Sequence, residues 1–411
     1  MRTPLRLVPL ALLTASTALA QTPPADAAPA PAPEPAPAPE PAAPPATAAP
    51  PATAAKATTT PAVDASPAEP SAPEEEGAPA LPTKLSVGKG GGYFQPSADL
   101  QFWGIYDRDV NGMDSTTLRI RRSELKIKGE IIPDWVAYGV MIDPAKLLTQ
   151  KQTTVGVDNG TPGASVTVPT RSGDQSILQD FYITLLTKYA DISGGQFKIP
   201  VSWEGSNSAS ELILPERALV SRKFGDKRDL GIKVEKKLGK YFYYSLGLFD
   251  GQGLNHLDKN NQKDAALRLE VYPVDGIMVG GVAYTSIGQR NLAGTKDRLE
   301  GDVRLSLHNV LVQAEYIWGR DKLQDNFHFQ RAHGMYGAVG YTLFDKLQPV
   351  FRVGFLDPNL SASNDRTTAY EGGVDYYFQG KQMKLQASFS VFHPQQGANS
   401  REGILAAQVT F

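Results

Sequence analysis

Five cationic side chains lie within ten residues of the sequence, between positions 119 and 128. These are Arg119, Arg121, Arg122, Lys126 and Lys128. Glu124 is the one acid in this segment. Guanidinium and ammonium groups attract oxyanions through charge-assisted hydrogen bonds and through their summed field. Such a cluster guides an anion without changing a covalent bond, so the segment is the best candidate for an anion-attracting basic stripe.

The apolar residues around this stripe alternate, but their phase slips. Leu118 and Ile120 occupy even positions, whereas Leu125 and Ile127 occupy odd ones. A single strand keeps each face in phase, so we expect a β-bulge within 121–124. The bulge would also turn the two neighbouring arginines away from the apolar face.

The sequence gives little support for catalysis, metal binding or nucleic-acid binding. The chain has no cysteine, which excludes thiol catalysis, disulfides and thiolate metal sites. The five histidines lie at 256, 308, 328, 333 and 393, and none are spaced as a zinc motif requires. His308 lies near Asp302 and Arg304 but has no matched serine. We therefore expect no enzyme, no metal and no cofactor, and the net charge of −2 argues against a nucleic-acid binder.

Strict alternation over about ten residues is the repeating pattern of the chain. In 298–307, Leu299, Val303 and Leu305 share one face with Leu307, and charged residues occupy the other face. This period of two predicts strands. A lysine or arginine facing lipid near the midplane costs about 2–4 kcal/mol, so the charged face should line a wet interior. The sequence thus favours a water-filled transmembrane barrel.

About sixteen such strands can be placed. They lie near 98–106, 117–131, 135–143, 177–187, 191–200, 228–236, 241–250, 264–272, 277–286, 298–307, 310–318, 330–343, 347–355, 368–378, 382–392 and 403–411. Short turns alternate with longer polar loops such as 107–116, 144–176 and 393–402, which is typical of outer-membrane barrels. No convincing amphipathic helix is present. The terminal Phe411 fits a last strand inserted into an outer membrane.

Aromatic residues near the strand ends suit the two interfacial girdles of such a barrel. The residues expected there are Trp103, Trp135, Tyr316, Trp318 and Tyr376.

The chain divides into three segments by composition. Residues 1–20 resemble a secretory signal peptide, with a basic start, an apolar centre and a small-x-small end at Ala18-Leu19-Ala20. Residues 21–84 are rich in alanine, proline and acids and are expected to be a disordered linker. This linker could be a passive tail or a tether to peptidoglycan. Residues 85–411 form the expected barrel domain.

Several stretches resemble the phosphate-selective porin O/P family. They include 118–130 with Met141-Ile142-Asp143, Gln179-Asp180-Phe181-Tyr182, and Gly195-Gln196-Phe197-Lys198-Ile199-Pro200. Leu214-Pro215-Glu216-Arg217, Lys227-Arg228-Asp229-Leu230-Gly231 and 244–251 also fit. The resemblance covers roughly 85–411 and is densest over 117–250.

This resemblance implies a sixteen-stranded porin, a homotrimer, whose third external loop, 201–227, folds into the lumen. Pore arginines and lysines of this family attract oxyanions. Besides the stripe, the cations expected to line the pore are Arg217, Arg222, Arg228, Arg304 and Arg352. Lumen acids, among them Asp180, Glu235, Glu300, Asp302, Glu315, Glu371 and Asp375, are nearly as numerous. They could instead pair with the cations across the lumen and cancel much of an anion preference.

The sequence therefore predicts an all-β transmembrane antiparallel barrel in the bacterial outer membrane, in contact with its lipid. It would let small hydrophilic solutes diffuse passively, with a preference for anions such as phosphate. The alternative is a closed structural barrel tethered to the cell wall through residues 21–84.

Overall fold

The fold is an antiparallel barrel of sixteen strands. The computed structural model describes residues 84–87, 90–148, 151–156, 165–170, 177–288, 293–322 and 328–411. The segments 1–20 and 21–83 lie outside the described residues. The barrel strands are β2 (Gly92–Arg108), β3 (Asp114–Ile132), β4 (Val136–Ile142), β7 (Leu178–Leu185), β8 (Asp191–Lys198), β9 (Arg228–Leu238), β10 (Phe242–Phe249), β11 (Lys263–Val271), β12 (Ile277–Ile287), β13 (Lys296–Leu307), β14 (Val310–Asp321), β15 (Gln330–Tyr341), β16 (Leu347–Asp357), β17 (Thr367–Gln379), β18 (Met383–Pro394) and β19 (Ser400–Thr410).

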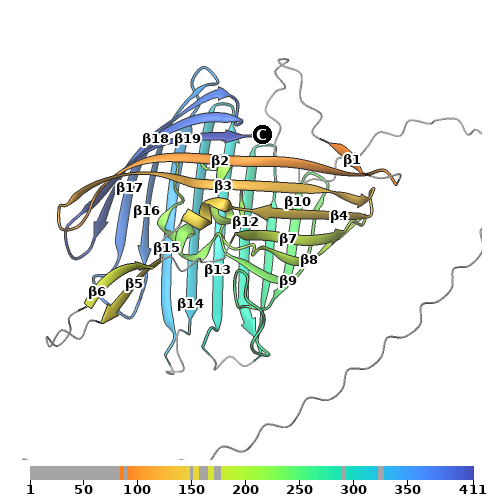
Figure 1. The fold of residues 1–411 in the computed structure, drawn as a ribbon, viewed down its shortest axis with the longest axis horizontal. Helices are drawn as coiled ribbons and strands as arrows, with labels where there is room; N and C mark the ends of the chain where they lie inside the picture. Colours follow the sequence, from red (N-terminus) through yellow and green to blue (C-terminus); the bar gives the residue numbers. More distant parts are fainter. Residues whose placement is uncertain are drawn as a thin grey trace, which may run out of the picture. The chain divides into compact units, whose positions relative to one another are not determined.

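The barrel closes where the last strand meets the first. Each strand pairs with its neighbour in the chain, and β19 pairs with β2 (Figure 1). At this seam the Ala98 amide donates to the Phe411 carbonyl at 2.7 Å, and the Phe411 amide donates back at 3.0 Å. The short strand β1 (Leu85–Val87) adds to the start of β2. Closure pairs the edges of both terminal strands, which an open sheet would leave exposed.

All sixteen strands expected from the alternation are present, and the differences are at their ends. Strands β2, β3, β18 and β19 extend beyond their predicted bounds, so the expected loops 107–116 and 393–402 shorten to 109–113 and 395–399. The prediction also missed β1 and the hairpin of β5 (Lys151–Gly156) with β6 (Ser165–Thr170).

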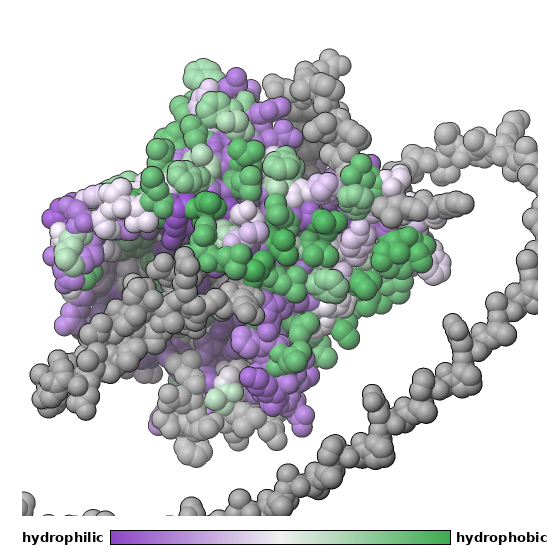
Figure 2. Space-filling view, viewed as in Figure 1, coloured by the Kyte–Doolittle hydropathy of each residue, from purple (hydrophilic) through white to green (hydrophobic). Residues whose placement is uncertain are grey.

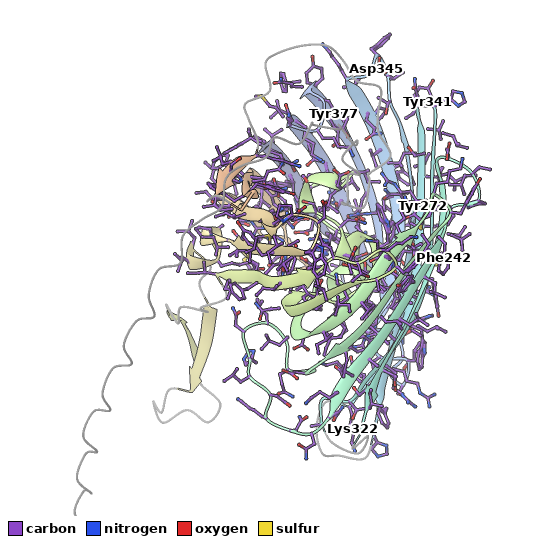
Figure 3. All side chains as sticks on the ribbon, turned by 90° about the vertical axis from the view of Figure 1, so that its right-hand side faces the viewer. Phe242, Tyr272, Lys322, Tyr341, Asp345 and Tyr377 are labelled. Carbon is purple, nitrogen blue, oxygen red and sulfur yellow. The ribbon has the colours of Figure 1, made fainter. Side chains whose placement is uncertain are left out.

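Short turns occupy one end of the barrel, and the longer connections occupy the other. Figure 3 places Tyr341, Asp345 and Tyr377 at one end, beside the β15–β16 and β17–β18 turns. Lys322 lies at the opposite end, in the β14–β15 connection. The predicted alternation is confirmed, and in outer-membrane barrels the short turns face the periplasm.

The two faces of the strands differ in chemistry as expected. On β14, Tyr316 points outward with 41% of its surface exposed, whereas the neighbouring Glu315 is inside and 2% exposed. Apolar side chains spread over the outer face, while hydrophilic ones gather toward the left and lower edges of Figure 2, near the β2–β3 and β14–β15 connections. Apolar side chains therefore face lipid, and ionisable ones face the interior.

Glu300 and Asp302 face the interior, as expected. Both are buried and paired with Arg268, in line with the alternative that lumen acids pair with cations, and Glu300 also contacts a loop inside the barrel. One prediction about a girdle side chain was wrong. Trp103 was expected in a girdle, but it points inward with 1% exposed. Its phase on β2 matches that of the inward Gln101, whereas Phe102 faces outward.

The other expected girdle residues lie on the outer face. Trp135, Tyr316 and Tyr376 are exposed, and Trp318 is partly so. Among the helices that the structure describes, none is long and apolar enough to span a membrane.

Candidate functional site

The inside of the barrel is narrowed by the segment 199–227, which connects β8 to β9 and is called the inward loop below. It contains the short helices α1 (Trp203–Ser206), η2 (Ala209–Glu211) and α2 (Leu219–Phe224), none of which the alternation predicted. Their small size explains the miss, because helices this short show no amphipathic period. The predicted folding of this loop into the lumen is confirmed by its contacts with inward-facing wall residues.

Apolar packing fixes one side of the inward loop to the wall. Val220, Phe224 and Leu214 are buried and belong to one core with wall residues such as Ile317. Glycines on the wall make room for them. A Cβ at Gly319 would lie 2.4 Å from the Phe224 ring, and one at Gly373 would lie 2.6 Å from Leu214 Cδ2. Larger residues at these two positions would push the loop into the lumen.

Two wall carboxylates hold the beginning of the inward loop. Glu300 on β13 accepts hydrogen bonds from the backbone amides of Ser202, at 2.6 Å, and Trp203, at 3.1 Å. Glu315 on β14 accepts from the Glu204 amide at 3.2 Å and from the Ser221 hydroxyl at 3.2 Å. These acids therefore satisfy buried donors of the loop, which would otherwise be costly to bury.

Arg352 on β16 joins the loop to strands β16 and β17 of the wall. Its guanidinium donates to Glu371 at 2.6 and 2.8 Å, to Glu204 at 2.9 Å and to the Glu216 carbonyl at 2.8 Å. Arg352 is fully buried, so the expectation that it lines the pore is wrong. Complete pairing is what allows a charge to stay at such a depth.

Lys384 anchors the middle of the loop in a similar way. Its ammonium donates to the carbonyls of Ser210, at 3.0 Å, and Leu212, at 2.8 Å. With Glu300, Glu315 and Arg352, it fixes the inward loop to strands β13 to β18. The space beside the loop is called the passage below. Residues of β3, β4 and β9 line it, together with Lys296 and Arg298 of β13.

The predicted bulge lies in the basic stripe of β3. Gln101 pairs with Arg122 and Phe102 pairs with Ile120, so Arg121 is the extra residue. Both Arg121 and Arg122 consequently point inward, as expected, although Leu118 and Leu125 stay on the outer face.

The buried indole of Trp103 is the platform for these arginines. The guanidinium carbons of Arg119, Arg121 and Arg122 lie 5.1, 5.2 and 6.0 Å from the ring centroid. Cation–π attraction at these distances offsets part of the repulsion among three like charges. This explains why Trp103 faces inward instead of joining a girdle.

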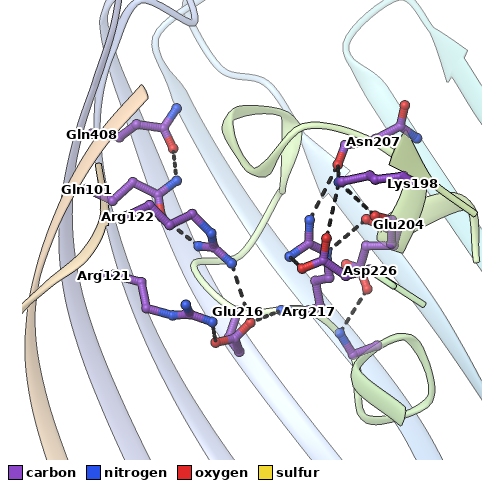
Figure 4. Close-up of polar contacts among 12 residues, drawn as sticks. Gln101, Arg121, Arg122, Lys198, Glu204, Asn207, Glu216, Arg217, Asp226 and Gln408 are labelled. Carbon is purple, nitrogen blue, oxygen red and sulfur yellow. Dashed lines mark hydrogen bonds and ion pairs between the residues drawn. The ribbon is translucent and has the colours of Figure 1, made fainter. Parts of the chain in front are cut away.

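Glu216 of the inward loop meets the stripe. Its carboxylate lies 2.9 Å from Arg121 Nη2 and 3.9 Å from Arg122 Nη2, and it accepts the Arg217 amide at 3.0 Å (Figure 4). Burial would raise the pKa of Glu216, but these arginines, the amide and Arg222 together lower it to about 2. Glu216 is therefore a carboxylate at neutral pH.

A second charged cluster lies around Asp226, at the end of the inward loop. Asp226 contacts Arg217 at 3.0 Å and Lys198 at 3.2 Å (Figure 4). It also lies 3.6 Å from Arg228. Burial opposes ionisation, but these three cations and Arg122 lower the pKa of Asp226 below its usual value. Arg217 is 3% exposed, so its expected place on the pore surface is also wrong. It holds the loop together instead.

Two adjoining cavities mark the passage beside the inward loop. The larger, of about 460 Å³, is lined by eight cationic side chains and four acidic ones. Its cations are Arg121, Arg122, Lys146, Lys223, Lys227, Arg228, Lys296 and Arg298. The smaller, of about 180 Å³, includes Lys126, Lys128 and Lys198 in its lining. Both cavities share Glu124 and Arg228, so they adjoin, and cations line both of them.

The remaining predicted site residues occupy varied positions. Lys126 pairs with Glu124 at 2.8 Å, and Arg228 pairs with Asp180 at 2.7 Å. Arg222 lies over the Phe392 ring and Arg304 over the Trp203 ring, at 5.7 and 4.8 Å, and neither residue is among the cations of the two cavities. Within the described residues, no group of acids and histidines could hold a metal ion.

Four lysines of the larger cavity, Lys146, Lys223, Lys227 and Lys296, were missed as pore residues. The ammonium groups of Lys146, Lys223 and Lys227 have no hydrogen bond or ion pair with any residue that the structure describes. Lys223 and Lys227 belong to the loop that was predicted to fold inward, which was a usable signal. Lys146 comes from the β4–β7 connection, and nothing in its sequence context indicates that it reaches the lumen.

The family model of phosphate-selective porin O and P matches residues 93–307. The chain belongs to this family. It is an outer-membrane porin, through which small hydrophilic solutes diffuse passively, and the resemblance read from the sequence is confirmed. A comparison with curated protein sequences yields no match.

Solved structures share the fold of this porin. An anion-selective porin from Comamonas acidovorans is 8% identical, with a TM-score of 0.54 over 78% of this chain and 100% of that one. The channel DcaP of Acinetobacter baumannii is 15% identical, with a TM-score of 0.54 over 80% and 100%. OmpT of Vibrio cholerae, in a trimer form, is 12% identical, with a TM-score of 0.52 over 78% and 99%. At these identities the likeness concerns the fold alone.

Proposed function

We propose that this porin prefers anions, with phosphate among its solutes. The observation that carries the proposal is the excess of cations in the larger cavity, where eight cationic side chains face four acidic ones. Two of those acids are engaged by backbone amides: Asp143 accepts from Ser123 at 2.9 Å, and Asp229 accepts from Leu230 at 2.9 Å. A passage lined by one sign of charge concentrates the opposite ion.

Some lumen acids pair with cations of this cavity: Glu216 lies 2.9 Å from Arg121, and Asp180 lies 2.7 Å from Arg228. The proposed excess therefore rests mainly on Lys146, Lys223 and Lys227. Four further lumen acids contact groups other than the cavity's cations. Glu300, Glu315 and Glu371 are buried against the inward loop or paired with Arg352, and Asp302 is paired with Arg268. They would therefore contribute to holding the loop in place, and the passage would keep its positive field.

The reversal potential in a salt gradient tests this preference. The purified porin is inserted into a planar bilayer between potassium chloride solutions of different concentration. We expect the reversal potential to have the sign produced when chloride permeates more readily than potassium. A reversal potential of the opposite sign, which indicates cation selectivity, would overturn the proposal. An open porin should give single-channel conductance steps in the same bilayer, whereas a closed structural barrel should give none.

We also propose that the porin does no chemistry on its solutes. His308 lies exposed in the β13–β14 turn with a φ of +53°, whereas Asp302 is buried inside the barrel and accepts a hydrogen bond from Arg268 at 3.0 Å. An assay for phosphate release from a phosphate ester checks this: the rate should equal that of buffer.

A homotrimer is proposed as the assembly. The trimer form described for OmpT of Vibrio cholerae supports it through the shared barrel fold. Native mass spectrometry in detergent should give three copies of the chain, and a stable monomer would contradict the assignment.

Residues 1–20 and 21–84 are proposed as a signal peptide and an acidic linker that contacts peptidoglycan. Strand β1 pairs with the start of β2, at the short-turn end of the barrel, so the linker would leave the barrel on the periplasmic side. Sedimentation with purified peptidoglycan should retain the mature chain and lose a variant that lacks 21–84. Equal retention of both would remove the tether.

A further inference from the structure

The two arginines at the bulge of β3 already hold an anionic group. The Glu216 carboxylate lies 2.9 Å from Arg121 and 3.9 Å from Arg122, and it is 14% exposed. Arg121 and Arg122 also line the 460 Å³ cavity, while Glu216 reaches them from the inward loop. A carboxylate and a permeating oxyanion offer the same acceptor oxygens to a guanidinium.

We propose that Glu216 is a resident ligand of the Arg121–Arg122 pair, which competes with permeating oxyanions and so limits how tightly the pore binds them. The proposal rests on the anion preference proposed above. In this proposal, Glu216 sets how strongly the two arginines attract an oxyanion and how readily they release it. A pore must bind an ion well enough to admit it and weakly enough to let it leave.

Contacts other than those of the Glu216 side chain also hold this residue in place. Its backbone carbonyl accepts from Arg352 Nη2 at 2.8 Å. Glu300 and Lys384 hold other parts of the inward loop. Removing the charge of Glu216 should therefore leave the loop in place while freeing the two guanidiniums toward the cavity.

Arg122 would remain positioned without Glu216. It donates to Gln101 Oε1 at 2.6 Å, and Gln101 in turn donates to Gln408 at 2.8 Å (Figure 4). Both arginines also keep the Trp103 ring beside them. The site is thus preorganised for an incoming anion, which lowers the entropic cost of binding.

The charge state of Glu216 is compatible with this role. Because its pKa is lowered to about 2, the carboxylate competes with anions throughout the neutral range. Glu216→Gln removes the charge with little change in volume. Glu211→Gln is the matched control, because Glu211 lies in the same loop but pairs with Lys381 at 2.5 Å.

The experiment measures single-channel conductance against potassium chloride concentration, and its inhibition by added inorganic phosphate. In Glu216→Gln we expect conductance to saturate, with about a tenfold lower half-inhibiting phosphate concentration than in the unsubstituted porin. Glu211→Gln should behave like the unsubstituted porin. Unchanged phosphate inhibition in Glu216→Gln, or weaker inhibition, would overturn the proposal.

A double variant separates ligand competition from loop movement. Glu216→Gln with Arg121→Gln restores the local net charge, so phosphate inhibition should return to that of the unsubstituted porin. A detached loop would instead raise conductance in both variants and lower phosphate inhibition, which contradicts the proposal. The reversal potential of the unsubstituted porin is read separately, so a failure of the anion preference is distinguishable from a failure of this role.

Discussion

Glu300 accepts a hydrogen bond of 2.6 Å from the backbone amide of Ser202, a residue with a φ of +67°. A non-glycine residue in this left-handed region is strained, and surrounding contacts must hold it. Glu300 therefore fixes the point where the chain leaves the wall and enters the lumen. The contact sets the beginning of the inward loop, whose later parts are held by Glu315, Arg352 and Lys384.

Glu300→Ala should loosen the inward loop. The amides of Ser202 and Trp203 would lose their acceptor, at a cost of about 1–3 kcal/mol. We expect larger single-channel conductance and a reversal potential closer to zero, because the passage widens. Glu300→Gln keeps one acceptor oxygen and should show a smaller change. If conductance stays the same in both variants, Glu300 does not hold the loop.

Trp103→Leu should reduce anion preference without closing the pore. Loss of the indole removes the platform for Arg119, Arg121 and Arg122, and each exposed cation–π contact is worth about 0.5–1 kcal/mol. The reversal potential measures this effect. Trp135→Leu is the control, because Trp135 is 65% exposed in the β3–β4 turn and should leave selectivity unchanged.

Charge reversal at the unpaired lysines should change selectivity strongly. Lys223→Glu with Lys227→Glu replaces two cations of the larger cavity by acids. We expect the chloride-to-potassium permeability ratio to fall by roughly threefold to tenfold, because the local field weakens. Lys259→Glu, on the exposed β10–β11 connection, should change the ratio little. An equal shift in this control would show that any surface charge suffices.

The contact between Glu216 and the stripe should persist down to strongly acid pH. A carboxyl whose pKa is lowered from 4.5 to about 2 stabilises its ion pairs above the unfolded pKa, and that contribution disappears as pH falls through the folded one. Phosphate inhibition would confuse this measurement, so chloride conductance is recorded. Conductance reports the folded porin, so it should stay level from pH 7 to about pH 3 and change only as the pH approaches the folded pKa of about 2. Glu216→Gln should lack this component, and identical profiles would contradict the assignment.

Sequence alone predicted the wall of the barrel well, because lipid contact imposes a period of two on every strand. The bulge at Arg121 was also predictable, since the phase of Leu118 differs from that of Leu125. Arg352 was misplaced, because its burial depends on Glu204, which lies 148 positions earlier in the chain. Trp103 was misplaced because an aromatic near a strand end fits either face. Trp103 lies two positions after the inward-facing Gln101 and therefore faces the same side of β2. Nothing in the sequence around Trp103 distinguished this inward side from the lipid-facing side.

The hydrogen bonds between Ala98 and Phe411 belong to the seam that closes the barrel, so neither terminal strand has a free edge there. Phe411 lies within hydrogen-bonding distance of Ala98, which is inside β2, so a linker of several residues would join the end of β19 to the start of β2 at Gly92. New termini could then be opened in any external connection, such as 395–399, without altering the order of neighbours around the ring. The porin is therefore a natural template for circular permutants that present their ends at the cell surface.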